Sequence, residues 1–148
     1  MSEDDEENRG QDQTGPVDYD VLDRIGRHLE QNSRFSRVQF RPQCAPNAVL
    51  AEYDTGYFPS RINRAYLRIS WFETDDFNIH YTEQYGDGMS WECRWDRHPN
   101  EHNSRDHFHP PPEASTLGDD EEYSRDWRVV LSRVLAVLDD RIKALWES

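Results

Sequence analysis

Residues 77–96 read FNIHYTEQYGDGMSWECRWD, two runs of alternating polar and apolar residues joined by a Gly-Asp-Gly turn. Pairing Tyr85 with Met89 gathers the large apolar side chains of both runs on one face. A slip of one residue would set apolar against polar side chains along the whole pair. The stretch therefore predicts an antiparallel hairpin with a three-residue loop, 86–88, in which a glycine adopts positive φ.

The same register fixes what each face of the hairpin carries. The facing pairs on the apolar face are Ile79 with Trp95 and Tyr81 with Cys93. The facing pairs on the polar face are His80 with Arg94, Asn78 with Asp96, and Thr82 with Glu92. Arg68 would lie beside them on a neighbouring strand, so we expect an open polar surface.

Segments on both sides of the hairpin complete the expected fold. Alternation predicts strands at residues 36–41, 48–53, 65–73, 77–85 and 89–96. A short helix with one apolar stripe is expected from an N-cap at Asp18 to residues 32–33. Strands bracketed by helices indicate an α+β fold. We expect an antiparallel β-meander of about five strands, with the N-terminal helix and a long C-terminal helix packed on its apolar face.

The C-terminal helix has the clearest pattern in the chain. Its apolar stripe, which lasts more than five turns, consists of Trp127, Val130, Leu131, Val134, Leu138, Ile142 and Leu145. The acidic run 119–122 precedes this helix, and Arg141 and Lys143 lie near its end, as the helix dipole favours. Residues 97–118, rich in His, Pro and Asn, are expected to form a loop.

The composition indicates a folded core with acidic ends. The 148 residues include 30 Asp and Glu against 17 Lys and Arg, which argues against a basic nucleic-acid binder or a polybasic membrane-surface protein. Residues 1–15 should be a disordered acidic tail, and 16–148 a single α+β domain. Residues 34–110 hold 11 acids and 9 bases, so this nearly balanced middle could still bind an RNA phosphate.

Almost all the basic residues are arginines. Lys143 is the one lysine among the 17 Lys and Arg residues. Many carboxylates with almost no lysine are typical of halophilic archaeal-type cytosolic proteins; the alternative is an acidic mesophilic protein with an arginine bias. No secretory signal and no apolar run near 20 residues is present, so we expect a cytoplasmic protein without a membrane span.

The most unusual segment is 95–112, WDRHPNEHNSRDHFHPPP, which holds four of the six histidines. His98 and His102 stand four apart, which places them on one face of a helix. His107 and His109 stand two apart, which places them on one face of an extended chain. No CxxC, HExxH, P-loop, GxGxxG or GxSxG signature accompanies them.

Three interpretations of this segment remain open. Histidines are ligands for zinc, manganese or iron, and the carboxylates near them are Asp96, Glu101 and Asp106. Histidine also transfers protons near neutral pH, and the arginines that could bind an RNA phosphate beside it are Arg94, Arg97 and Arg105. The third interpretation is a polar loop whose histidines cap backbone groups or face solvent.

A strand ending in Trp95-Asp96, followed by His98-Pro99, a spacer and His107-Phe108-His109, resembles the TumE family of small toxins. The alternating strands with a Gly-Asp-Gly turn fit the same layout, and the resemblance covers roughly residues 36–112. It implies the toxin half of a type II toxin–antitoxin pair, held inactive by an antitoxin that is usually a helix-turn-helix protein. Ribonuclease action is implied by similarity to other small toxins.

From this resemblance and the residue types we expect a possible metal-independent ribonuclease. The expected catalytic residues are His98, His107, His109, His102 and Asp96. The expected substrate-binding residues are Arg94, Arg97, Arg105, His80 and Arg68. No cofactor or metal is expected for this activity. Two alternatives stay open: a non-enzymatic interaction module that uses the open sheet face, and a metalloprotein with the histidines as ligands.

Overall fold

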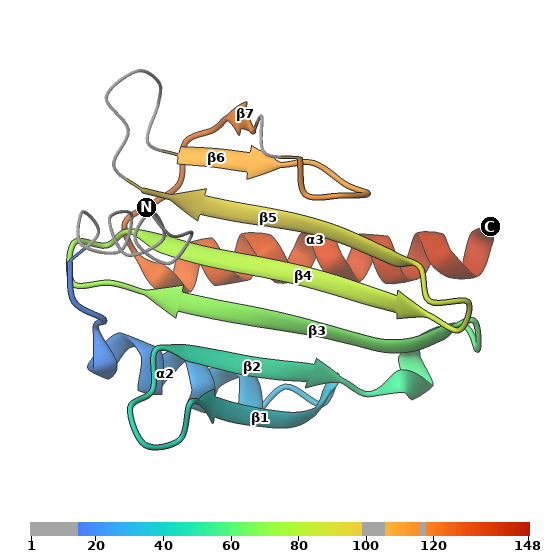
Figure 1. Cartoon of the computed structure of the whole chain (residues 1–148), viewed down its shortest axis with the longest axis horizontal. Coiled ribbons are helices and arrows are strands. Elements are labelled where there is room, and N and C mark those ends of the chain that lie inside the picture. The colour runs from blue at the N-terminus through green and yellow to red at the C-terminus, as the bar shows by residue number, and fades with distance from the viewer. Residues whose placement is uncertain (1–14, 99–105, 116–117) are drawn as a thin grey trace, which may run out of the picture.

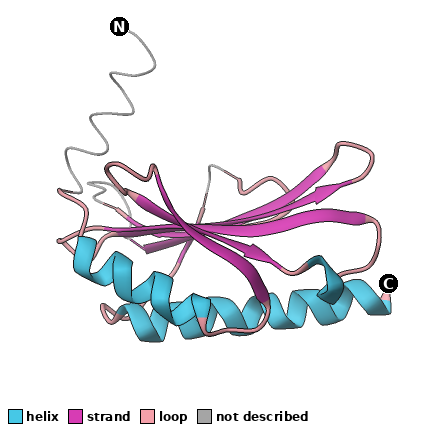
Figure 2. Cartoon of the chain, turned by 90° about the horizontal axis from the view of Figure 1, so that it is seen from below, coloured by secondary structure: helices cyan, strands magenta, loops and turns pink. Residues whose placement is uncertain are grey.

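The computed structural model of the chain describes residues 15–98, 106–115 and 118–148, with two helices packed on one face of an antiparallel sheet (Figures 1 and 2). The sheet has seven strands in sequential order, β1 to β7. Among the described residues, no helix covers the other face of the sheet (Figure 2). The predicted α+β meander with both helices on one face is confirmed. The predicted acidic tail, apart from Gly15, lies outside the described residues.

The elements follow one another in the order that the sequence indicates. In chain order they are α2 (Tyr19–Glu30), β1 (Phe35–Arg41), β2 (Ala48–Tyr53), the short 3₁₀ helix η1 (Thr55–Tyr57), β3 (Ile62–Trp71), β4 (Phe77–Tyr85), β5 (Ser90–Arg97), β6 (Asp106–His109), β7 (Asp119–Asp120) and α3 (Trp127–Glu147). The first five strands match the predicted runs to within a few residues at their ends.

The strands β6 and β7 are additions to the predicted meander of about five strands. Both lie at its β5 edge (Figure 1), within the residues expected to form a loop and an acidic approach to the last helix. They are short and carry little of the apolar alternation that marks the other five strands. The N-cap of α3 is Asp126, whose side chain accepts a hydrogen bond from the backbone N–H of Arg128.

The predicted register of the β4–β5 hairpin is confirmed. Ile79 faces Trp95, and Tyr81 faces Cys93. The backbone N–H of Tyr85 donates to the carbonyl of Met89 at 2.9 Å, which closes the three-residue loop. Gly88 adopts a φ of 90°, the left-handed conformation that a glycine tolerates without a steric penalty.

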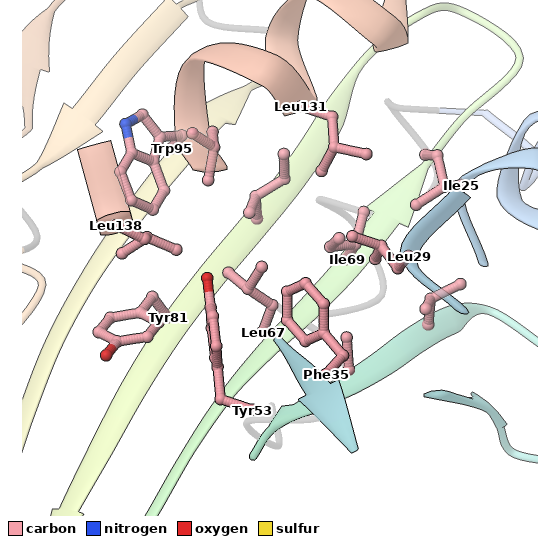
Figure 3. Close-up of a cluster of buried hydrophobic side chains, with 14 of the residues drawn as sticks. Ile25, Leu29, Phe35, Tyr53, Leu67, Ile69, Tyr81, Trp95, Leu131 and Leu138 are labelled. Atoms are coloured by element: carbon pink, nitrogen blue, oxygen red, sulfur yellow. The ribbon is translucent and has the colours of Figure 1, made fainter. Parts of the chain in front are cut away.

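The core lies between the helices and the sheet (Figure 3). Asp18 caps α2 by accepting the N–H of Val21 at 3.0 Å. The buried apolar side chains of both helices belong to the predicted stripes, namely Leu22, Ile25 and Leu29 on α2 and Val130, Leu131, Val134, Leu138, Ile142 and Leu145 on α3. Val21 and Trp127, at the edges of these stripes, are only partly buried.

Arg141 docks α3 on the sheet. Its guanidinium bonds both carboxylate oxygens of Glu83, at 3.0 Å from Nε and 2.7 Å from Nη2. Glu83 is fully buried on β4, where it also accepts the hydroxyl of Tyr81 at 2.7 Å. The guanidinium lies 3.7 Å from the centre of the Trp91 ring. A buried charge pair of this kind fixes α3 in one position along β4.

Candidate functional site

Strand β6 pairs with β5, and this pairing brings the two ends of the histidine-rich segment, residues 95–112, together on the open face of the sheet. Its pairing with β5 sets Arg94 opposite His109 and Asp96 opposite His107. Because side chains alternate along a strand, these four residues point away from the helices. The four remaining positions of the ladder face the other way, namely Trp95, Arg97, Asp106 and Phe108.

The carboxylate of Asp96 is the centre of this cluster. One oxygen, Oδ2, accepts Nε2 of His109 at 2.8 Å and Nε of Arg94 at 3.2 Å. The other, Oδ1, lies 3.5 Å from Nδ1 of His107 and 3.7 Å from Nε2 of His98. Asp96 is only 2% exposed, so it is a buried carboxylate surrounded by groups that can carry positive charge.

His109 is held on both sides of its ring. Its Nδ1 lies 2.6 Å from the carbonyl oxygen of Ser115, and its Nε2 faces Asp96. Both partners are acceptors, so both ring nitrogens must donate for each contact to be a hydrogen bond. Gly118 also lies against the cluster, because a Cβ there would be 2.9 Å from Cε1 of His109 and 3.1 Å from Cβ of His107.

Two buried polar atoms of the cluster have no hydrogen-bond partner among the described residues: Oδ1 of Asp96 and Nδ1 of His107. They lie beside each other, 3.5 Å apart, too far for a hydrogen bond. The other nitrogen of His107, Nε2, lies 3.8 Å from Oδ1 of Asp120 on β7. The ring of His107 is therefore placed between two carboxylates.

The groups that solvent can reach form a row beside the buried cluster. The side chain of His98 is 43% exposed. The register places Arg68, His80 and Arg94 next to one another on β3, β4 and β5. His80 lies 2.8 Å from Oε1 of Glu92. This face therefore presents basic groups over adjacent strands, about 5 Å apart from strand to strand.

Arg97, expected to bind substrate, lies on the opposite face of the sheet. It is 3% exposed, and its guanidinium donates to the carbonyls of Asp75 at 3.1 Å, Tyr123 at 3.1 Å and Ser124 at 2.8 Å. Burial lowers the pKa of Arg97 from its usual value, and the carboxylate of Asp106 opposes that effect. The contacts of Arg97 fasten the segment that leads into α3.

Tyr123 joins that segment to the back of β6. Its N–H donates to Oδ2 of Asp106 at 2.7 Å, and its hydroxyl donates to the carbonyl of His107 at 3.0 Å. Burial, and after it the charge of Glu121, raises the pKa of Tyr123, so the hydroxyl keeps the proton that it donates. These contacts hold the backbone of His107 in place.

The structure therefore gathers His98, His107, His109, Asp96 and Arg94 in one cluster, with His80 and Arg68 in the adjoining row. His102 and Arg105 lie outside the described residues. Sequence reasoning missed Ser115, Gly118 and Asp120, since all three reach the cluster through chain folding that no local pattern indicates.

Residues 23–142 match the family model described as Toxin TumE. The chain belongs to the TumE toxin family. The matched range contains the whole Asp96 cluster and most of both helices. Searches of the curated proteins and of the solved structures return no match to the chain.

Membership makes the chain a toxin component of a toxin–antitoxin system, which implies an antitoxin as its partner. The resemblance carried by Trp95-Asp96, His98 and His107–His109 is thereby confirmed as a family relationship. Among the residues described for this TumE toxin, no helix is long and apolar enough to cross a membrane.

Proposed function

We propose that this toxin cleaves RNA at the open face of β5 and β6, with the groups around Asp96 as its active site. The observation that carries the proposal is the single buried carboxylate that contacts three histidines and one arginine. Imidazoles transfer protons near neutral pH, and arginine binds phosphate oxygens. Cleavage of a phosphodiester needs both abilities at one place.

His98 is the group that meets the substrate in this proposal, because it is the exposed histidine of the described cluster. The ribose 2′-hydroxyl attacks the adjacent phosphorus, and His98 takes up the hydroxyl proton. The bond from phosphorus to the 5′-oxygen breaks, and that oxygen takes a proton from water. Asp96 lies 3.7 Å from Nε2 of His98 and favours the charged imidazole that this step creates.

His107 and His109 act as positioning residues in the proposed site. Both are buried, and both contact Asp96. The 2.8 Å contact from His109 fixes the carboxylate, and the strand pairing of β6 fixes His109. Loss of either histidine would leave Asp96 free to turn, so their removal should reduce cleavage through His98.

Arg94 and Arg68, with His80 between them, would bind the RNA backbone. They lie side by side on three adjacent strands of the open face. Neighbouring strands are about 5 Å apart, so the three side chains form one continuous row that an extended RNA backbone could follow. The net charge of -13 does not prevent this, since salt screens distant charges and the local groups are basic.

The proposed location of the toxin in the cell follows from its proposed substrate, RNA. RNA and the translation machinery lie in the cytoplasm, and we place the toxin there. Its antitoxin is proposed to be a helix-turn-helix protein that blocks the open face of β4, β5 and β6. A partner bound there would cover Arg94 and His98 together.

Expression of single variants in a growing host tests the proposal. His98→Ala, His107→Ala and His109→Ala should each relieve growth arrest and RNA loss, whereas His28→Ala, which removes an exposed histidine of α2 outside the site, should not. Growth arrest without RNA loss would favour the interaction module. Arrest and RNA loss that persist in all three site variants would overturn the proposed site.

A further inference from the structure

We infer that Asp96, His98 and His107 form a binding site for one divalent transition-metal ion. One ligand atom from each of the three residues lies within 4.8 Å of the ligand atoms of the other two. Oδ1 of Asp96 lies 3.5 Å from Nδ1 of His107 and 3.7 Å from Nε2 of His98. Ligands about 2.1 Å from one ion lie about 3 to 3.5 Å apart, so small side-chain movements close the site.

A second observation points to the same place. Oδ1 of Asp96 and Nδ1 of His107 are buried, and in the part of the chain that the structure describes neither has a hydrogen-bond partner. Buried polar atoms almost always have a partner, and those that lack one need an explanation. These two atoms face each other without bonding, and both are atoms that coordinate metal ions. An ion between them would satisfy both at once.

The second polar atoms of the two buried ligands, Asp96 and His107, each face a neighbouring side chain, as in established metal sites. Oδ2 of Asp96 accepts His109 and Arg94, which leaves Oδ1 for an ion. Nε2 of His107 faces Asp120 at 3.8 Å, which leaves Nδ1 for an ion. These outer contacts orient the two buried ligands before an ion arrives.

Two imidazoles and one carboxylate select the class of ion. This ligand set suits Zn²⁺, Fe²⁺, Mn²⁺ or Co²⁺ and does not suit Ca²⁺ or Mg²⁺, which prefer oxygen ligands. Three protein ligands leave further coordination positions open. Because the side chain of His98 is exposed, those positions would face solvent. The site would hold the ion together with water.

The inference goes beyond RNA cleavage and does not depend on it. An ion bound to His98 would hold the side chain that the proposed cleavage uses as its base. Metal binding and metal-free cleavage are therefore expected to exclude each other, and Zn²⁺ should inhibit the toxin. Zinc binding itself is measured without any RNA.

Titration of the full chain, stripped with a chelator, tests the site. Co²⁺ should give visible d–d absorption that saturates at one ion per chain, and calorimetry with Zn²⁺ should give the same stoichiometry. A Cys44→Ser background removes the exposed thiol as a competing ligand. His98→Ala and His107→Ala should each weaken binding at least tenfold, and His80→Ala, on the same face, should not.

The exposed position of His98 makes His98→Ala the decisive variant, because its fold should persist even if His107→Ala unfolds. Absence of saturable binding, or equal binding in His98→Ala with a normal melting curve, would overturn the metal site. Cleavage measured in chelator reports on the proposed function alone, so the two proposals fail separately.

Discussion

Nε2 of His109 lies 2.8 Å from Oδ2 of Asp96, and this contact joins β6 to the centre of the cluster. Both side chains are buried, so water cannot readily replace either partner of this contact. It is shorter than the 3.5 Å contact from His107 to the same carboxylate, and both contacts link the HxH element at 107–109 to the Trp-Asp step at 95–96, the two sequence features that resemble the TumE family.

Removal of His109 should therefore destabilise the fold as well as the site. His109→Ala leaves a buried carboxylate without its closest partner, and the free energy of unfolding should fall by about 2 kcal/mol. Urea denaturation followed by tryptophan fluorescence measures the change. His28→Ala, at an exposed position of α2, is the control and should change it by less than about 0.5 kcal/mol. Equal stability of the two variants would contradict the contact.

Gly118 should tolerate no larger side chain, because its Cα faces the two buried histidines. A Cβ would lie 2.9 Å from Cε1 of His109, so Gly118→Ala must displace the ring and should cost about 1 to 3 kcal/mol. Gly86→Ala is the matched control, since the nearest atom there is 3.6 Å away. A melting temperature that is lower for Gly86→Ala than for Gly118→Ala would contradict this packing.

The buried pair of Arg141 and Glu83 should dominate the docking of α3. Arg141→Met leaves the carboxylate of Glu83 buried without its charged partner, and the free energy of unfolding should fall by about 3 to 5 kcal/mol. The double variant Arg141→Met with Glu83→Leu should recover most of this loss, because no unpaired charge remains. A double-mutant cycle in urea measures the coupling, and additive effects would contradict it.

Cys93 should contribute to the loss of stability at high pH. Burial, and after it the charge of Glu83, raises the pKa of the Cys93 thiol from 9.0 to about 12. The folded state therefore holds this proton more tightly than the unfolded chain, and the stability gained is present below pH 9 and lost as the pH rises toward 12. In urea titrations, Cys93→Ala should lose stability less steeply over this range than the wild type.

The exposed thiol provides the control for that experiment. Cys44→Ala should leave the pH slope unchanged, because Cys44 lies on the surface. At pH 8 a thiol reagent should label Cys44 quickly and Cys93 only when the fold opens, since the thiolate is the reactive form. Equal labelling rates at both positions would contradict the raised pKa.

Features that depend on residues close together in the chain could be predicted from the sequence. The β4–β5 hairpin was predictable in full register, because a slip would have mixed the two faces. The same alternation also assigns Arg97 to the side of Trp95, which indicates burial rather than substrate contact. Spacing alone placed His107 and His109 on one face.

The parts that escaped prediction depend on contacts between distant segments. Strand β6 has four residues and is held by β5, Tyr123 and the Asp96 cluster, none of which a local pattern can reveal. Arg141 fits the expected helix end by position, but its partner Glu83 lies 58 residues away in the chain. Ser115 likewise reaches His109 only through the path of the loop.

The most direct test of the account is the rate at which purified toxin cleaves RNA in the presence of a chelator. The account predicts measurable cleavage by the wild type and by His28→Ala. It predicts a loss of about 100-fold or more in His98→Ala, the size of effect that a general base supplies. Equal rates in His98→Ala and His28→Ala would contradict the claim that the cluster around Asp96 is the active site.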